Sequence, residues 1–245
     1  MHNIKTWHQR TLVIFTIIIV SFSISSCTQS EQRAEKENNI VGRIGTDIAL
    51  YKFHFKHGAT RMSGVITAAE ELLEAIRNPK IELSEEQIEL DIHTLTSLWL
   101  AATPTTEYLA LVSSGEISLV TSERLRRKFK EMHCDQEKLL QFESLQIRYI
   151  NQELRPFLNS RIDKTTLETS QNFNTKGPTR FPSPFESSPK ELLKNREFAN
   201  LLVDVLFFTK RIMLPYNRLN STMARMEEII AEDYPTVVIE TYGPH

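Results

Sequence analysis

The sequence predicts an all-α protein, an elongated bundle of long antiparallel helices behind an N-terminal membrane segment. Three observations support this fold class. Apolar residues recur at steps of three and four over long stretches. Only seven of the 245 residues are glycine, and strand-like alternation is confined to short stretches. Long helices with a single apolar stripe bury those stripes against one another, which favours a bundle.

The N-terminus has the pattern of an export or anchor segment. Lys5 and Arg10 precede the uncharged, isoleucine-rich stretch 11–26, and no acidic residue occurs before Glu31. This charge distribution predicts that the remainder is extracytoplasmic, on the periplasmic side. Two interpretations stay open. In one, residues 24–27 resemble a lipobox and Cys27 is lipidated; in the other, the helix is an uncleaved single-pass anchor, although residues 11–26 span only about 24 Å.

The first half of the body reads as helices with clear boundaries. A stripe from Ile40 to Ile76 predicts a helix from about Glu31 to Asn78, where Pro79 stops it. Ser84 begins a capping box and opens a helix that Pro104 ends. Thr106 can cap a short helix ending at Gly115. We expect residues 116–120 to be extended, and Ser122 to cap a long helix to about Asp163 that Pro156 bends.

The second half combines a long loop with a last helix. Residues 164–188 are rich in Thr, Ser, Asn and Pro, which predicts a loop. Ser188 and Pro189 open a helix to Asp233, with a jog near Asn195 and a kink at Pro215. The predicted organisation is therefore a signal or anchor segment (1–27), an extracytoplasmic helical domain (28–234, with the loop 164–188) and a C-terminal tail (235–245).

One stretch carries a family resemblance. Residues 108–120, Tyr-Leu-Ala-Leu-Val-Ser-Ser-Gly-Glu-Ile-Ser-Leu-Val, are followed by Leu125-Arg126, and the chain here resembles a bacterial domain-of-unknown-function family of N-terminally membrane-anchored helical envelope proteins. The stretch 195–200 resembles the C-terminal part of that family. The resemblance implies an extracytoplasmic helical body and brings no activity, cofactor or catalytic residue. The chain departs from the family at its membrane end, where Cys27 occurs.

The residues with chemical potential are few and scattered. His54 and His57 share a helix face, but a metal needs at least a third ligand. We interpret His93 as a hydrogen-bonded boundary residue. His133 and Cys134 are adjacent, so their side chains diverge on a helix, and we interpret Cys134 as a buried, inert thiol. No metal site is therefore predicted.

Composition and motifs point away from catalysis and from nucleic acid. The chain has no nucleophile elbow, no metalloprotease motif, no Walker loop and no dinucleotide fingerprint. We predict no catalytic residue and no cofactor. The net charge is −2, and removal of residues 1–27 would make the body more acidic, so a basic footprint for nucleic acid is missing. The basic run 124–128 is interpreted as a solvated helix face.

These observations favour a non-enzymatic, membrane-tethered interaction or scaffold protein of the bacterial envelope. It would present a helical surface to a second copy or a protein partner, and the loop 164–188, with Phe181 and Phe185 between prolines, is the predicted recognition feature.

Two alternatives remain. The first is an extracytoplasmic small-ligand-binding module, with a pocket between helices lined by Trp99, Tyr149 and Tyr216. The second, more remote, is an uncharacterised hydrolase, which would need converging His, Asp, Glu or Cys residues in a cleft.

Overall fold

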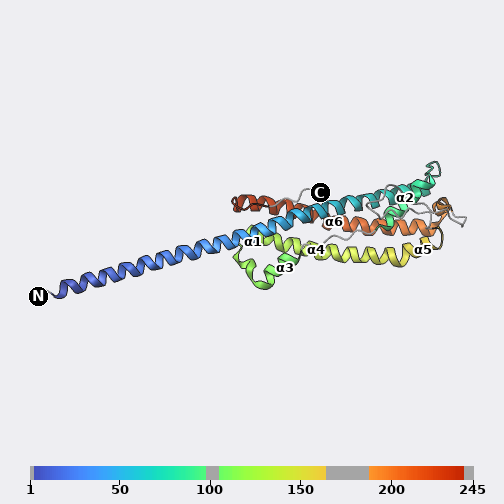
Figure 1. The fold of residues 1–245 in the computed structure, drawn as a ribbon. Helices are drawn as coiled ribbons and strands as arrows, with labels where there is room; N and C mark the ends of the chain where they lie inside the picture. The colour runs from blue at the N-terminus through green and yellow to red at the C-terminus, as the bar shows by residue number, and fades with distance from the viewer. Residues whose placement is uncertain (1–2, 98–104, 164–187, 240–245) are drawn as a thin grey trace. The chain divides into compact units, whose positions relative to one another are not determined.

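The computed structural model describes residues 3–97, 105–163 and 188–239, and its side chains are described from Ser30 onward, except at 98–107 and 164–187. Every regular element in these ranges is a helix, as Figure 1 shows. The predicted all-α class is therefore confirmed. Cys27, Trp99 and most of the loop 164–188 lie outside the described side chains.

Helix α1 (Asn3–Arg77) is longer than the sequence suggested. The N-terminal segment and the helix expected from Glu31 form one continuous element, because no proline or glycine pair interrupts residues 3–41. The predicted end is confirmed: the amide of Asn78 makes the last helical bond, to the carbonyl of Glu74, immediately before Pro79. Among the described residues, no helix has both the length and the hydropathy of a membrane span.

Helix α2 (Glu85–Thr96) begins as predicted and ends early. The Oγ atom of Ser84 accepts a hydrogen bond from the amide of Gln87 at 3.1 Å, which confirms the N-cap. The expected end near Pro104 is wrong, because Ser97 closes the helix with two hydrogen bonds to the carbonyl of His93, one from its amide and one from its hydroxyl.

The corner after α2 contains one confirmed and one wrong prediction. Helix α3 (Thr105–Ser114) ends at Gly115, whose φ of 76° is the left-handed conformation that favours glycine. The expected extended stretch after it is instead a 3₁₀ helix, η1 (Glu116–Leu119). The hydroxyl and amide of Ser118 both bond back to the carbonyl of Gly115, and this local closure overrides the alternating pattern.

The long helix expected after Ser122 consists of three parts. Helix α4 (Glu123–Tyr149) begins at its predicted cap and passes into a π-helical segment, η2 (Ile150–Leu154), and then into α5 (Arg155–Asn159). Pro156 has no amide to donate, and the change of register just before it agrees with the predicted disruption.

The last helical region shows the predicted jog. Ser188 caps a 3₁₀ helix, η3 (Pro189–Lys194), and Asn195 then caps α6 (Arg196–Asp233) by accepting a bond from the amide of Phe198. Helix α6 continues through Pro215.

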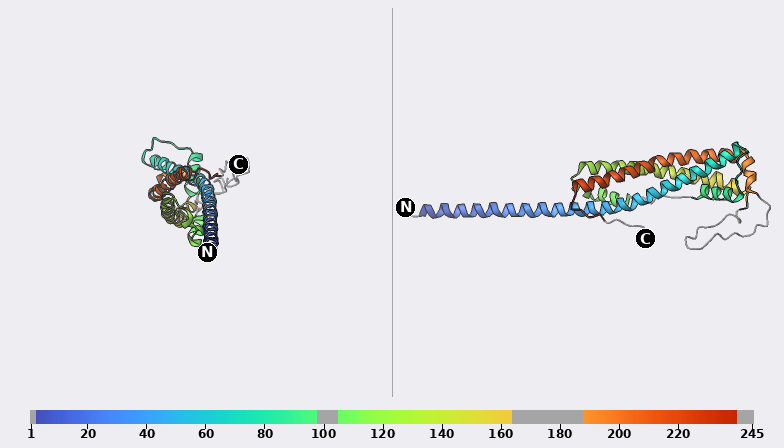
Figure 2. Two further views of the ribbon diagram at one scale, coloured as in Figure 1. Left: turned by 90° about the vertical axis from the view of Figure 1, so that its left-hand side faces the viewer. Right: turned by 90° about the horizontal axis from the view of Figure 1, so that it is seen from above.

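The chain forms two compact units. Unit 1 comprises residues 1–49, 104–128 and 226–245, and unit 2 comprises residues 50–103 and 129–225. In unit 2, α4 and α6 lie side by side in opposite directions (Figure 2), because residues 143, 146 and 149 bond to residues 216, 209 and 204 in turn.

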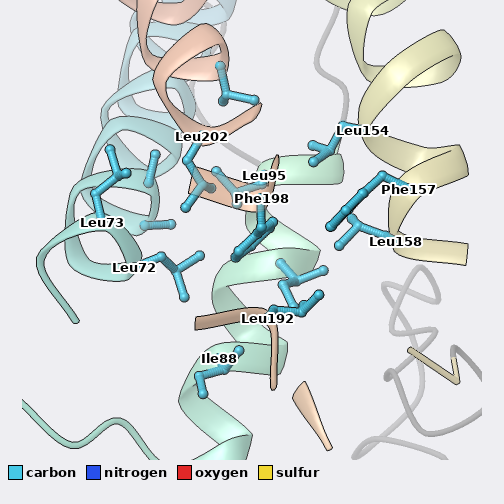
Figure 3. Packing of buried hydrophobic residues seen from close by; sticks show 14 of the residues in the cluster. Leu72, Leu73, Ile88, Leu95, Leu154, Phe157, Leu158, Leu192, Phe198 and Leu202 are labelled. Carbon is cyan, nitrogen blue, oxygen red and sulfur yellow. The ribbon is translucent and has the colours of Figure 1, made fainter. Parts of the chain in front are cut away.

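The core of unit 2 gathers side chains from six elements, which are α1, α2, η2, α5, η3 and α6 (Figure 3). Leucine and isoleucine side chains from α1 and α2 meet those of α5, η3 and α6, and the rings of Phe157 and Phe198 stack with centroids 6.0 Å apart. The labelled members of this cluster are Leu72, Leu73, Ile88, Leu95, Leu154, Phe157, Leu158, Leu192, Phe198 and Leu202. Helix α6 contributes three fully buried residues to this cluster, Phe198, Leu202 and Val205.

Candidate functional site

A polar network ties three segments of unit 1 together. The Oε1 atom of Glu37 on α1 accepts hydrogen bonds from the amide and the hydroxyl of Thr121, both at 2.7 Å, and from the hydroxyl of Tyr234 at 2.6 Å. The same tyrosine oxygen accepts a bond from the amide of Ser122 at 3.1 Å. The network therefore joins α1, the start of α4 and the end of α6, which lie far apart in the sequence.

The donors around Glu37 favour its ionised form. Burial alone would raise the pKa of this carboxyl, since only 7% of the residue is exposed. The hydrogen bonds from Tyr234 and Thr121, with a smaller contribution from Arg33, outweigh burial and hold the pKa below its usual value. This geometry supports a structural role, because Thr121 and Tyr234, which donate to Glu37, belong to the protein itself.

The basic run at the start of α4 belongs partly to this network. Arg124 forms ion pairs with Glu232, at 2.8 Å, and with Asp233, and the hydroxyl of Ser122 bonds to Asp233 at 2.6 Å. Hydrogen bonds from Ser122 and Arg124 lower the pKa of the Asp233 carboxyl. Arg124 thus contacts the end of α6, whereas Arg127 and Lys130 are exposed.

Two tyrosines of the predicted ligand pocket make hydrogen bonds to other residues of unit 2. Tyr216 is fully buried, donates to Glu143 at 2.7 Å and packs against Phe55. Tyr149 donates to the carbonyl of Leu201 and to Asp204. Burial raises the pKa of both phenols, and the nearby carboxylates add to the effect. Trp99, the third predicted wall, lies outside the described residues.

A buried polar row runs along the inner face of α4. Gln136, Glu143 and Gln146 are each at most 5% exposed and follow the spacing of core residues. Gln146 donates to Thr209 at 2.8 Å, which in turn bonds to the carbonyl of Val205. The amide of Gln136 has no hydrogen-bond partner among the described residues. Two of these side chains, Glu143 and Gln146, contact α6 in the interior of unit 2. The predicted pocket between helices, with Trp99 as one of its walls, stays a prediction.

Asp91 on α2 is a further buried carboxyl besides Glu37 and Glu143, and it has different surroundings. It is 4% exposed, and Oδ1 accepts one bond from Gln87 at 2.9 Å, while Oδ2 has no hydrogen-bond partner among the described residues. Burial raises its pKa to about 6, with a further contribution from Glu71 and only partial relief from Gln87.

The histidines and the cysteine of the body do not converge. His57 is exposed, and its ring stacks on Phe53. His93 faces the Ser97 hydroxyl at 3.5 Å, as a boundary residue would. Among the described side chains, no group of three His, Cys, Asp or Glu residues could hold a metal ion. The prediction for Cys134 is wrong, because Cys134 is exposed on the outer face of α4.

One open cleft lies in unit 2, where the end of α1, the segment before α2, η3 and the start of α6 meet. Its volume is about 740 Å³. The floor is apolar, and Ile76, Leu83, Leu193 and Ala199 both line the cleft and pack against the core cluster. The full lining is Ala75, Ile76, Pro79, Ile81, Glu82, Leu83, Lys190, Leu193, Lys194, Asn195, Arg196 and Ala199.

The rim of this cleft is mainly cationic. Lys190, Lys194 and Arg196 stand against a single lining carboxylate, that of the exposed Glu82. Lys194 pairs with Glu191 at 2.8 Å, whereas Lys190 and Arg196 have no acidic partner among the described residues. The cleft therefore combines an apolar floor with positive charge at one side. It can accommodate an apolar group that carries an anionic end.

Sequence reasoning did not find this cleft. The segments that build it, residues 75–83 and 190–199, are more than a hundred residues apart, and no motif marks either of them. The only local signal was the Ser188 cap with Pro189, which fixed the start of η3.

Comparisons of the chain with family models, with curated proteins and with solved structures found no match. The resemblance carried by residues 108–120 therefore stays a prediction.

Proposed function

We propose that the chain is a membrane-tethered helical protein of the bacterial envelope that acts by binding a partner and not by catalysis. The observation that carries this proposal is the continuity of α1. The basic residues and the apolar stretch 11–26 lie in the same helix as Glu37 and the core residues of its second half. A helix without a flexible linker transmits the position of a tethered end to the body.

The network around Glu37 supports the same proposal. It joins α1 to the start of α4 and to the end of α6, shortly after the proposed tether in the sequence. A body fastened in this way would present its surface at a fixed height above the membrane, in an elongated, antiparallel bundle. Lys5 and Arg10 precede residues 11–26, and no acidic residue occurs before Glu31. This charge distribution favours an extracytoplasmic body.

A ligand-binding module is the second candidate, and the cleft described above favours it. Its apolar floor and cationic rim are the features expected of a site for a small ligand. This candidate is compatible with the tether, because no lining residue of the cleft belongs to the stretch 11–26.

The tether is tested by mass spectrometry of the N-terminus of the protein purified from its native membranes. An acylated peptide that begins at Cys27 would establish the lipoprotein, and an intact Met1 peptide would establish the anchor. The variant C27S should lose the acyl mass, whereas C134S, the matched control at the exposed Cys134, should keep it. Recovery of the full chain in the soluble fraction, with neither modification nor membrane association, would contradict the proposal.

A further inference from the structure

We propose that the cleft between residues 75–83 and 190–199 binds a free anionic amphiphile, a molecule with one carboxylate or phosphate head on an aliphatic or aromatic body. This inference does not depend on the membrane tether, because every lining residue belongs to unit 2. It assigns a ligand class to a surface for which the sequence contains no motif.

The first argument is that the lining combines apolar side chains with charged ones. Ile76, Leu83 and Leu193 supply apolar surface that is only partly covered by the core, and burial of such surface by a ligand is favourable by about 25 cal/mol per Å². The volume of about 740 Å³ is within the usual range of ligand sites.

The second argument is charge complementarity. Lys190 and Arg196 are exposed at the rim and lack an acidic partner among the described residues, so an anionic head would gain two charge-assisted contacts. Arg196 is also the first residue of the 38-residue helix α6, whose N-terminal dipole favours an anion and whose first turn also carries Glu197. Glu82 is the one carboxylate on the lining, and the three cations Lys190, Lys194 and Arg196 outnumber it.

The third argument is that an amphiphile fits the cleft better than a polypeptide does. An extended peptide would bring backbone amides and carbonyls that need partners, and the side-chain oxygen of Asn195 is already used by the amide of Phe198. The segment 164–187, which precedes η3 in the sequence, carries Lys164, Lys176 and Arg180 against two acids, so its charge does not complement the rim. A hydrocarbon body with one charged head leaves no such groups unsatisfied.

The test uses the full chain in phosphatidylcholine nanodiscs and a dodecanoate probe that bears a photoreactive diazirine. After irradiation, mass spectrometry should find the label in peptides containing residues 75–83 and 190–199. Unlabelled dodecanoate should compete with the probe, and uncharged dodecan-1-ol should compete about tenfold less well, which corresponds to about 1.4 kcal/mol.

Three variants keep the result interpretable. K190Q/R196Q should reduce labelling about tenfold, whereas K56Q/R127Q, which removes the same charge from exposed residues outside the lining, should leave it unchanged. A199F should fill the cleft and abolish labelling while the far-ultraviolet circular dichroism stays that of the wild type.

Four results would overturn the proposal. The first three are label confined to residues 3–29, equal competition by dodecan-1-ol, and equal labelling of wild type and K190Q/R196Q. Loss of labelling in nanodiscs that contain phosphatidylglycerol, without any added dodecanoate, would assign the cleft to a bilayer lipid and also contradict a free amphiphile. If the N-terminal mass spectrometry shows no tether, the same labelling is carried out on the full chain in solution, because every lining residue belongs to unit 2.

Discussion

Units 1 and 2 each bury a carboxyl group, and the two groups respond to burial in opposite ways. Glu37 in unit 1 and Asp91 in unit 2 are 7% and 4% exposed. Glu37 accepts three hydrogen bonds and its pKa is lowered, whereas Asp91 accepts one and its pKa is raised to about 6. Burial therefore does not decide the charge state by itself; the number of donors aimed at the carboxylate does.

The same difference separates the ways in which the two units are held together. Unit 1 joins its segments through Glu37, Tyr234 and Arg124, so charged and polar groups provide much of its specificity. Unit 2 depends on the apolar cluster around Leu72 and Phe198, with isolated polar pairs such as Tyr216 and Glu143 inside it. We expect pH and single substitutions to affect the two units differently.

The largest effect is expected from F198A in the core of unit 2. Phe198 is fully buried and stacks on Phe157, so the cavity left behind should reduce the free energy of unfolding by about 3–5 kcal/mol. Urea denaturation followed by circular dichroism measures this change. The control is F207A on the same helix, where the ring is 51% exposed and the change should stay within about 0.5 kcal/mol. Equal effects of the two variants would refute an apolar basis for unit 2.

The next largest effect is expected from D91N, and it should be stabilising. The folded pKa of Asp91, about 6, lies above its ordinary value of 3.8, so the folded state disfavours the ionised form. The penalty is absent below about pH 4, grows as the pH rises towards 6 and is complete above it. At neutral pH it amounts to at most about 3 kcal/mol.

Denaturation of the wild type and D91N at several pH values tests this sign. The two free energies of unfolding should diverge as the pH rises from 4 to 7, with D91N the more stable protein at neutral pH, because the asparagine oxygen can still accept the bond from Gln87. A D91N protein that is less stable than the wild type at pH 7 would contradict this prediction.

A smaller and opposite effect is expected from E37Q in unit 1. The folded pKa of Glu37 is lowered, so its contribution to stability is present above its unfolded pKa and is lost as the pH falls through the folded pKa. Replacing the carboxylate by an amide weakens its charge-assisted bonds and should cost about 2 kcal/mol at neutral pH. The difference from the wild type should shrink in acid, and T121V, which removes only the hydroxyl bond, should cost less.

The local features of the fold could be predicted from sequence because they depend on neighbouring residues. Ser84, Ser122 and Ser188 were identified as caps from residue type and position, and each accepts the expected amide bond. Gly115 was identified because a helix that ends in the left-handed conformation favours glycine. Such signals need no knowledge of what packs against the segment.

The features that sequence missed all depend on distant partners. Whether Cys134 is buried follows from which face of α4 meets α6, and the cleft forms only where residues 75–83 meet residues 190–199. Glycine in the interior of a helix ordinarily weakens it. In unit 1, Gly45 makes room for Ile239, whose Cγ1 would lie 2.8 Å from an added Cβ. No local pattern indicates which of these glycines has such a neighbour.

The smallest effect is expected from two glycine substitutions within α1, and they should differ in sign. An added Cβ at Gly58 would lie 2.6 Å from Cε1 of Tyr216, whose hydroxyl is held by Glu143, so the ring cannot move without loss of that bond. At Gly64 the nearest atom is Cγ2 of Thr94, 4.0 Å away. G64A should therefore raise the free energy of unfolding by about 1 kcal/mol, the ordinary helix preference for alanine.

In G58A the same helix preference opposes the steric strain. Overpacking of about 2 kcal/mol against about 1 kcal/mol of helix preference should leave a net loss of about 1 kcal/mol. The double variant G58A/Y216F separates the two contributions: releasing the phenol from Glu143 lets the ring shift, so the added methyl should cost less in this background than in the wild type. If G58A and G64A stabilise the protein equally, the close approach of α1 to α6 in unit 2 is wrong, and with it the claim that this unit is specified by tight apolar packing.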